Sequence, residues 1–450
     1  MHAATCPGEY YGNDFMPAHI AQAREFMAAS GVNASLMEDS FEELAQRNDI
    51  PEFDVISMQG VWSWTSQRNR EVIVDLIRRK LVAGGVVCLG YNCNPGWSLI
   101  QPLAHLLKLH TERSAGRNDI AERMKDAIAF VTRLFESGAF FSQTNPGVID
   151  CLRQIGGSDI SYLAHEYLVD GWRAFSFSET AAMMSEAKLD FAGSANLLDE
   201  VDSLLLPEQM KRILLDIDDT CLYETTRDYL VNQMFRMDIY VKGERFLLPS
   251  ELDDAYRDTY FTLLKLPDHI PYNYGLGRIQ VQLVPDQIRP LIACLTADGG
   301  RPKSFAELRA IDPWTSAAPQ ELMQILVLLS GSGFISPAKS PEASSRSRGA
   351  CERFNEYLLG RAKFDDRVGW LASPITGGGI DVSQTEQLFL LALKSLPEEP
   401  DAMAGFVAQV RAQSRGVPSL DEGEIAQLTA EAQVFLSQRL EILRMIGVCP

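Results

Sequence analysis

The sequence predicts an α/β fold whose parallel sheet is interrupted, and then followed, by long helices. Three observations support this prediction. Over the first hundred residues, short apolar segments alternate with amphipathic segments of helical period, which is typical of strand–helix units. From about Ser98 the pattern changes to long helices, and α/β character returns after Ser161–Leu168. From Pro249 onward the pattern is again mostly helical.

The first elements are predicted from their apolar patterns and end signals. Strands are expected at Tyr10–Phe15, Ala34–Glu38, Phe53–Met58 and Val86–Tyr91. Helices are expected from Pro17 to Gly31, over Phe41–Gln46 and over Asn69–Leu81. Ser40 with Glu43 three residues later forms a capping box for the second helix. Gly84-Gly85 is expected to turn the chain into the fourth strand, which is as apolar as a buried parallel strand should be.

The later elements follow the same rules. Helices are expected at Leu99–Leu109, Ile120–Phe135 and Phe177–Glu186, and strands at Leu189–Ala195 and Met237–Lys242. Ser336–Gly349 is rich in serine, proline and arginine, so we expect a linker or a disordered loop. A winged-helix-like unit over 283–338 is predicted from Ile288–Cys294, Ser304–Leu308, Pro319–Leu329 and Phe334–Ser336. Because Glu321–Leu329 carries no lysine or arginine, we expect this unit to serve protein interaction or homodimer packing rather than DNA binding.

Composition argues against several classes of function. Sixty acidic against 41 basic residues give a net charge of −19, which repels phosphate backbones and anionic lipid, so no nucleic-acid partner is expected. The apolar runs are far shorter than the ~20 residues that cross a bilayer, so no membrane insertion is expected. Eight cysteines without a CxxC pair and six histidines without an HxxxH pair indicate buried thiols in a reducing cytoplasm and no metal site.

Two acidic residues follow consecutive predicted strands. Because parallel strands end at one edge of a sheet, where ligands bind, Asp14 can accept hydrogen bonds from two ribose hydroxyls. Asp39, after the next strand, can accept the amino group of an adenine. Aspartate after a strand is also a common turn residue or N-cap. Together with the spacing of Leu81–Val86, the two acids become a more specific pattern.

This pattern resembles the class I methyltransferases that use S-adenosylmethionine. The resemblance is carried by Gly12-Asn13-Asp14, Glu38-Asp39-Ser40-Phe41, Phe53–Gly60 and Leu81–Val86. A narrower resemblance is to the subgroup that carries a methyltransferase regulatory domain, to which bacterial protein-lysine methyltransferases belong. It rests on Gln59–Trp64, Tyr91–Trp97, Tyr162–Leu168, Arg227-Asp228-Tyr229-Leu230 and Phe235-Arg236. The family usually has histidine at position 59 and tyrosine at 62, where this chain has Gln59 and Trp62, so position 59 supplies no imidazole.

The resemblance implies S-adenosyl-L-methionine as cofactor and a methyltransferase activity, with protein lysine, small molecules and glycans all open as acceptors. The implied cofactor-binding residues are Asp14, Asp39, Ser40, Gln59 and Gly60. The implied substrate residues are Trp62, Tyr91, Asn92, Trp97, Tyr162, His165 and Tyr167, and core packing is the alternative for each aromatic side chain. No catalytic residue is implied.

The resemblance also implies a domain organisation. Residues 1–111 and 172–247 form the methyltransferase domain, 112–171 an inserted helical cap, and 248–450 a helical C-terminal domain. Leu189–Ala195 then pairs beside Met237–Lys242 in the sheet of Val86–Tyr91.

The start of the chain departs from the family pattern. Such folds place a first strand and a glycine-rich turn about twenty residues before the ribose-binding acid. Only thirteen residues precede Asp14. We therefore expect an N-terminally truncated chain, a sheet without its first strand, and impaired cofactor binding. A non-catalytic binding or regulatory protein that keeps the fold is the alternative function.

A second motif points to different chemistry. Asp216-Ile217-Asp218-Asp219-Thr220 matches the DxDxT signature of haloacid-dehalogenase-type phosphatases, with Asp216 as nucleophile and Asp218 as acid/base. That chemistry needs the motif at the end of a strand, whereas Pro207–Asp219 has the pattern of an amphipathic helix. Residues two apart on a helix point about 200° from each other, so we expect no convergence of the two carboxylates.

Overall fold

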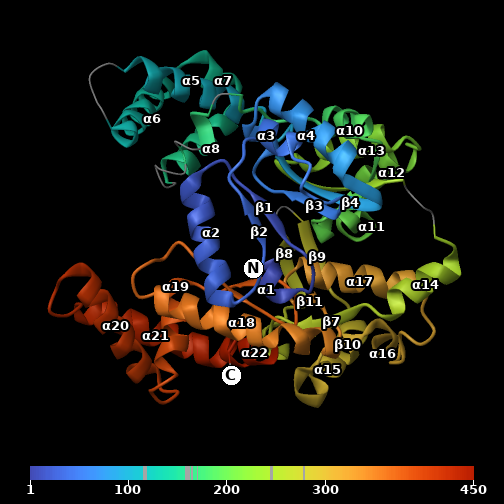
Figure 1. The fold of residues 1–450 in the computed structure, drawn as a ribbon, viewed down its shortest axis with the longest axis vertical. Coiled ribbons are helices and arrows are strands. Elements are labelled where there is room, and N and C mark those ends of the chain that lie inside the picture. Colours follow the sequence, from blue (N-terminus) through green and yellow to red (C-terminus); the bar gives the residue numbers. More distant parts are fainter. Residues whose placement is uncertain are drawn as a thin grey trace. The chain divides into compact units, whose positions relative to one another are not determined.

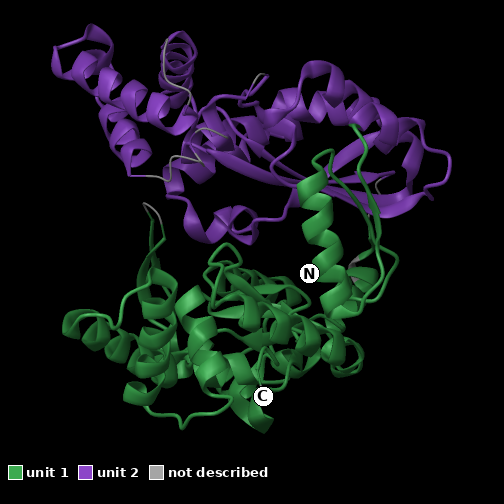
Figure 2. Ribbon diagram, turned by 60° about the vertical axis from the view of Figure 1, so that its left-hand side comes forward, with its two compact units in different colours: residues 1–40, 246–450 green, residues 41–245 purple. Residues whose placement is uncertain are grey.

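The computed structural model describes residues 1–114, 119–157, 163, 166–169, 171–243, 247–276 and 279–449. The chain divides into two compact units, shown in Figure 2. Unit 1 consists of Met1–Ser40 and Phe246–Pro450, and unit 2 of Phe41–Arg245. Unit 2 is therefore inserted into the sequence of unit 1, and each unit is described by itself.

A four-stranded mixed sheet forms the centre of unit 2 (Figure 1). Its strands, in spatial order, are β3 (Phe53–Met58), β4 (Leu81–Asn92), β6 (Phe235–Lys242) and β5 (Leu189–Ser194). β3 and β4 are parallel, whereas β6 is antiparallel to both β4 and β5. The predicted pairing of the two last strands within the sheet of Val86–Tyr91 is confirmed.

The glycine pair before the fourth strand has a different role from the expected one. β4 already begins at Leu81, which lies opposite Phe53, and the next paired residues are Val86 and Val55. The register shift leaves Gly84-Gly85 in an irregularity inside the strand, where Gly84 has a positive φ of 78°. The predicted turn before the strand was therefore wrong, because β4 pairs with β3 on both sides of the glycines.

Helices cover one face of this sheet. They are α3 (Phe41–Gln46), α4 (Gln67–Lys80) and α10 (Phe177–Glu186), together with the short helix η1 (Trp62–Trp64). α4 starts at Ser66, whose side chain accepts from the Asn69 amide, and its Ile73 and Ile77 pack against Leu89 of β4. On the opposite face the side chains are exposed or half-buried, and Val55 is 60% exposed.

A second, helical core in unit 2 follows β4. It is built by α5 (Ile100–Arg113), α6 (Ile120–Glu136), α7 (Phe140–Thr144) and α8 (Gly147–Gly156). Trp97 and Tyr167 belong to the same core. The sequence boundaries of an inserted cap at 112–171 stay a prediction.

Three further helices precede the last strand of unit 2. These are α11 (Asp202–Leu205), α12 (Glu208–Leu215) and α13 (Thr220–Val231). α12 ends at Leu215, so Asp216 and Asp218 lie beyond the helix. The helical pattern predicted over Pro207–Asp219, which placed both residues on a helix, was therefore wrong at its C-terminal end. Asp219 is the N-cap of α13 and accepts from the Leu222 amide.

The N-terminal segment of unit 1 contains α1 (His2–Thr5), β1 (Tyr11–Asn13), α2 (Pro17–Ser30) and β2 (Ser35–Met37). β1 and β2 pair in parallel, and α2 ends at Gly31 in the left-handed conformation, as predicted. Within the described residues β1 and β2 form a two-stranded sheet of their own, whereas the sequence predicted one continuous sheet.

Partners for the N-terminal segment come from far along the chain. α1 and α2 contact α18 (Pro341–Arg361). The Thr5 hydroxyl donates to the Gly377 carbonyl at 2.8 Å, and the Arg353 guanidinium donates to the Ser30 carbonyl at 3.2 Å. Contacts of high sequence separation therefore hold the first forty residues in unit 1.

The helix α18 corrects the prediction of a loop at Ser336–Gly349. Ser340 caps the helix by accepting from the Ala343 amide, and Pro341 occupies the first turn. The buried residues recur at helical spacing, but two of the first ones are serines: Ser344, Ser347, Cys351, Phe354 and Leu358. Small polar side chains form the first part of the packed face, so composition alone indicated a linker.

The rest of unit 1 is mostly helical, as expected. After α14 (Pro249–Arg257) it contains β7 (Tyr260–Leu263), η3 (Pro267–His269), β8 (Asn273–Leu276), β9 (Ile279–Gln282), α15 (Pro285–Gly300), β10 (Lys303–Ser304), α16 (Phe305–Arg309), α17 (Pro319–Gly331) and β11 (Ile335–Ala338). β10, β7 and β11 form one antiparallel sheet. The C-terminal elements are β12 (Trp370–Ala372), β13 (Gly379–Asp381), α19 (Gln384–Ala392), α20 (Pro400–Arg415), α21 (Glu422–Gln438) and α22 (Leu440–Met445).

Two further properties concern the described residues. Among them no helix is both long and apolar enough to cross a membrane. All eight cysteines are free thiols.

Candidate functional site

The carboxyl ends of β3 and β4 lie at one edge of the unit 2 sheet, because the two strands are parallel. Gln59 and Gly60 follow β3 directly. The Gln59 amide donates to the Cys88 sulfur at 3.3 Å, and its oxygen occupies the space that a side chain at Gly90 would need. Gly60 has a positive φ of 63° and open space where a Cβ would stand. The backbone at Gly60 is thus open to close approach by a ligand.

The loop after β4 is held by backbone hydrogen bonds on both sides. Cys93 donates from its amide to the Met234 carbonyl at 2.7 Å, and Asn94 donates to the Phe175 carbonyl at 2.9 Å. The Trp97 indole donates to the same Met234 carbonyl at 2.8 Å. The Gln233 carbonyl lies so close to Gly96 that a side chain would collide with it. The loop 92–97 therefore has a fixed conformation at the sheet edge.

The predicted substrate residues of this region are buried. Trp62 is fully buried and packs on Phe175, and Tyr91 is fully buried on the helix-covered face of β4. The Asn92 amide donates to the Glu166 carboxylate at 3.2 Å. Tyr162 and His165 lie outside the described residues. Roles in substrate binding stay a prediction for all of these residues.

Three aromatic rings gather beside the loop. Trp97 lies edge-on to Trp172 at 5.1 Å and to Tyr167 at 6.4 Å between ring centroids, and Tyr167 and Trp172 are also 6.4 Å apart. Glu166, the neighbour of Tyr167, is buried. We call these three rings and Glu166 the aromatic cluster. Aromatic rings can hold a cationic group with an aliphatic stem, and a carboxylate can pair with such a cation.

A buried charge network, which the sequence analysis missed, lies at the base of the loop. Arg236 forms ion pairs with Glu224 at 2.8 Å, Asp228 at 2.6 Å and Asp238 at 2.8 Å. Asp238 also accepts from the hydroxyls of Tyr91 at 2.6 Å and Tyr240 at 3.1 Å. β6 carries polar residues at every second position, Arg236, Asp238 and Tyr240, and this alternation was the signal that could have revealed the network.

The electrostatics of this network follow from its burial. Burial raises the pKa of Asp238, of Asp228 and of Glu224, although Arg236 acts in the opposite direction on each. Burial alone would lower the pKa of Arg236, but the surrounding carboxylates raise it above its ordinary value. Burial and Asp238 also raise the pKa of Tyr91 well above its ordinary value, so its hydroxyl stays protonated and donates. The network orders the end of β4, and Tyr91 keeps its proton while its hydroxyl donates a hydrogen bond to Asp238.

The remaining predicted cofactor residues lie in unit 1. Asp14 follows β1, and its carboxylate accepts from the Met16 amide and contacts His19 Nδ1, both at 2.8 Å. Its side chain is 40% exposed, so further lone pairs can accept hydroxyl donors. The Asn13 side chain donates to the Asp39 carbonyl at 2.9 Å and accepts from its amide at 3.1 Å, which joins the ends of β1 and β2. Ser40 follows, and a cofactor role stays a prediction for all three residues.

Neither metal binding nor the phosphatase signature has support in the described residues. No group of three or more His, Cys, Asp or Glu side chains among them could hold a metal ion. Asp216 follows the helix α12 rather than a strand, so the motif lacks the strand end that phosphoryl transfer by this signature requires.

Comparisons with known proteins agree with this picture. Residues 159–242 match the family described as a predicted methyltransferase regulatory domain. The uncharacterized protein sll1526 of Synechocystis is 33% identical over 98% of this chain and 87% of its own length. The uncharacterized protein RP789 of Rickettsia prowazekii is 22% identical over 52% of this chain and 42% of its own length.

Among solved structures, PKMT2 of Rickettsia typhi in complex with AdoHcy has a TM-score of 0.67 and 16% identity, over 97% of this chain and 88% of that one. A second structure of PKMT2 gives a TM-score of 0.64 with the same coverage. At this identity the likeness establishes a shared fold. The resemblance inferred from the sequence is thereby confirmed: the chain belongs to the family of Synechocystis sll1526, and it carries the methyltransferase regulatory domain on the fold of PKMT2.

Proposed function

We propose that this protein is an S-adenosyl-L-methionine-dependent methyltransferase whose acceptor is an amine, with protein lysine as the favoured substrate. The observation that carries the proposal is the edge formed by β3 and β4, with an open glycine at position 60 and a fixed loop at 92–97. That edge belongs to a fold shared with a protein solved in complex with AdoHcy.

Each unit supplies a group that suits such a cofactor. Asp14 offers an accessible carboxylate for ribose hydroxyls, and Gly60 offers a backbone that a ligand can approach. When bound, the cofactor supplies a methyl group on a positively charged sulfur. The chain then has to hold the acceptor in line and exclude water, because methyl transfer is a displacement that depends on positioning.

The aromatic cluster supports an amine acceptor. The rings of Trp97, Tyr167 and Trp172 can hold an alkyl stem, and the Glu166 carboxylate can attract the ammonium group at its end. The amine must lose a proton before it attacks, and a carboxylate at this position can receive it. The Asn92 amide, which donates to Glu166, holds the carboxylate in place at the sheet edge.

Full cofactor affinity, in this proposal, needs one more parallel strand beside β3. In doubly wound sheets of order 3-2-1-4-5-6, the strand with the glycine-rich turn lies beside the fourth strand. Among the described residues β3 pairs on one side only, with β4, and Val55 on its uncovered face is 60% exposed. A free edge and an uncovered apolar face support this part of the proposal. Homodimer packing through the winged-helix-like unit 283–338 and a cytoplasmic location belong to the same proposal.

Calorimetry tests the cofactor, and mass spectrometry tests the acceptor. S-adenosyl-L-methionine is titrated into this chain and into a chain extended at its N-terminus by a strand with a glycine-rich turn. Lysine-containing peptides are then scored for a gain of one methyl group, with Glu166→Gln as the test variant and Glu208→Gln, on an exposed helix end of unit 2, as the matched control. Binding without methyl gain would indicate the non-catalytic alternative, and no binding by either chain would contradict the proposal.

A further inference from the structure

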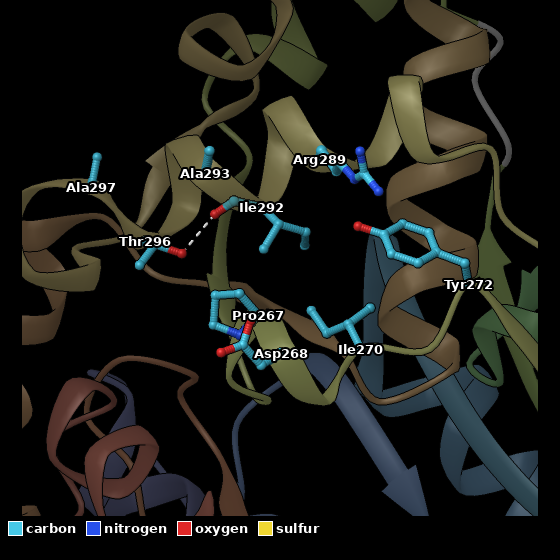
Figure 3. Close-up of a pocket in the computed structure, with 9 residues that line it drawn as sticks. All are labelled: Pro267, Asp268, Ile270, Tyr272, Arg289, Ile292, Ala293, Thr296 and Ala297. Carbon is cyan, nitrogen blue, oxygen red and sulfur yellow. Dashed lines mark hydrogen bonds between the residues drawn. The ribbon is translucent and has the colours of Figure 1, made fainter.

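A pocket of about 530 Å³ lies within unit 1, and none of the residues named in the proposed methyl transfer lines it (Figure 3). One wall is a single face of α15, because Arg289, Ile292, Ala293 and Thr296 are spaced by three and four residues. The other wall is the segment from Pro267 to Tyr272, which contains η3 and leads to β8. A helix face and a loop thus border an open pocket of the size that small-molecule sites occupy.

Two opposite charges face this pocket from different walls. Arg289 projects from α15, and its guanidinium carbon lies 5.6 Å from the centre of the Tyr272 ring. Figure 3 shows the side chains of Arg289 and Tyr272 directed toward each other, with Asp268 on the other side of the pocket. Within the part of the chain that the structure describes, neither Arg289 nor Asp268 has an ion-pair partner within 4.0 Å, and the two do not pair with each other.

The surface between the two charges is apolar. Ile270 and Ile292 are both buried and lie between Arg289 and Asp268 in Figure 3. The Thr296 hydroxyl donates to the Ile292 carbonyl at 2.7 Å, so toward the pocket it can only accept. The order across the pocket is therefore a cation, an apolar strip and an anion.

We propose that this pocket binds a small zwitterion whose carboxylate and ammonium groups are separated by a short methylene chain, as in 6-aminohexanoate. The planar guanidinium of Arg289 can hold the carboxylate through two parallel hydrogen bonds. Asp268 accepts the ammonium group, and the methylene chain lies on Ile270 and Ile292. A ligand with one charge alone makes only one of the two charge-assisted contacts, which gives the pocket its selectivity.

Isothermal calorimetry on the full chain tests this proposal with four probes. 6-Aminohexanoate and 5-aminopentanoate carry both charges at the two ends of a methylene chain, whereas hexanoate and hexylamine each carry one. We expect saturable binding of the two zwitterions and at least about tenfold weaker binding of each singly charged probe, as the loss of one charge-assisted hydrogen bond would give.

Two exposed substitutions separate the contributions of the two charges. Arg289→Gln should weaken the binding of 6-aminohexanoate and hexanoate but leave that of hexylamine unchanged. Asp268→Asn should weaken the binding of 6-aminohexanoate and hexylamine but leave that of hexanoate unchanged. Arg257→Gln, at an exposed arginine of unit 1 outside this pocket, is the matched control. The proposal is overturned if 6-aminohexanoate gives no saturable heat, if hexanoate or hexylamine binds as tightly, or if both pocket variants bind like the parent. None of these results depends on methyl transfer.

Discussion

Removing the cation of the buried charge network should destabilise unit 2 far more than removing one of its carboxylates. Arg236 is 3% exposed and contacts Glu224, Asp228 and Asp238. Arg236→Met keeps most of the side-chain volume but leaves the buried Asp228 and Asp238 and the half-buried Glu224 without this cation. Asp238→Asn removes one negative charge and keeps an oxygen and an amide, which the rotatable hydroxyls of Tyr91 and Tyr240 can still satisfy.

The expected magnitudes differ clearly. Taking one partner from a buried ion pair costs about 3–5 kcal/mol, so Arg236→Met should lose at least that much. For a unit of about 200 residues, 1 kcal/mol corresponds to roughly 2–4 °C, which gives a fall in Tm of ~6–20 °C. Asp238→Asn should cost no more than ~1.5 kcal/mol, the value of an ordinary hydrogen bond.

The pH dependence of the stability lost in Arg236→Met gives a second, independent test. The folded-state pKa values of Glu224, Asp228 and Asp238 are raised above their ordinary values of 4.5, 3.8 and 3.8. Such groups stabilise the fold most below those ordinary values, and the contribution is lost as the pH rises through the raised folded values. Without Arg236 these pKa values rise further. The loss of unfolding free energy in Arg236→Met should therefore be small near pH 5 and complete near pH 8.

Urea unfolding followed by tryptophan fluorescence measures both effects, because Trp62, Trp64, Trp97 and Trp172 all lie in unit 2. Hydrogen exchange of peptides from β4 and β6 separates unit 2 from unit 1. The reasoning is refuted if Arg236→Met is as stable as Asp238→Asn, or if its deficit shrinks as the pH rises.

Three further predictions concern single residues. Asp14→Ala, in a chain extended by a strand and glycine turn, should weaken S-adenosyl-L-methionine by roughly tenfold to a hundredfold in calorimetry, and an unchanged affinity would remove Asp14 from the cofactor site. Gly96→Ala should lower the free energy of unfolding by about 1–3 kcal/mol through its collision with the Gln233 carbonyl, and a parent-like Tm would contradict the packing described for this loop. Asp216→Asn should change stability by less than ~0.5 kcal/mol and leave methyl transfer intact, whereas a magnesium-dependent phosphatase activity lost in this variant would overturn the assignment.

The sequence predicted elements well wherever one apolar period continued through the segment. Phe41–Gln46, Phe53–Met58 and Phe177–Glu186 have the predicted bounds. The antiparallel pairing of β5 and β6 was also predicted, from the order of elements in the family that the chain resembles. The prediction was wrong at α18, because Ser344 and Ser347 occupy buried positions that the apolar pattern could not register.

The candidate site was less predictable, because its order depends on contacts between distant segments. Asp14 and Asp39 could be placed after strands from sequence alone, and the structure has them there. The grouping of Arg236 with Glu224, Asp228 and Tyr91 depends on which helix covers which strand. The helical pattern predicted over Pro207–Asp219 ends at Leu215 in the structure, four residues earlier, since helix ends depend on local capping rather than on period.

The attachment of the first forty residues to α18 also sets an order of events during synthesis. The hydrogen bond between Thr5 and Gly377 joins residues 372 positions apart. At about 5–20 residues per second, the ribosome needs roughly 20–75 s to deliver the second partner after the first. During most of that interval β1 and β2 lack α18. The inserted residues 41–245 emerge before α18 and can fold in the meantime. Residues 1–40 are thus synthesised long before their partners, and they are exposed to proteases and chaperones on the ribosome until α18 has formed.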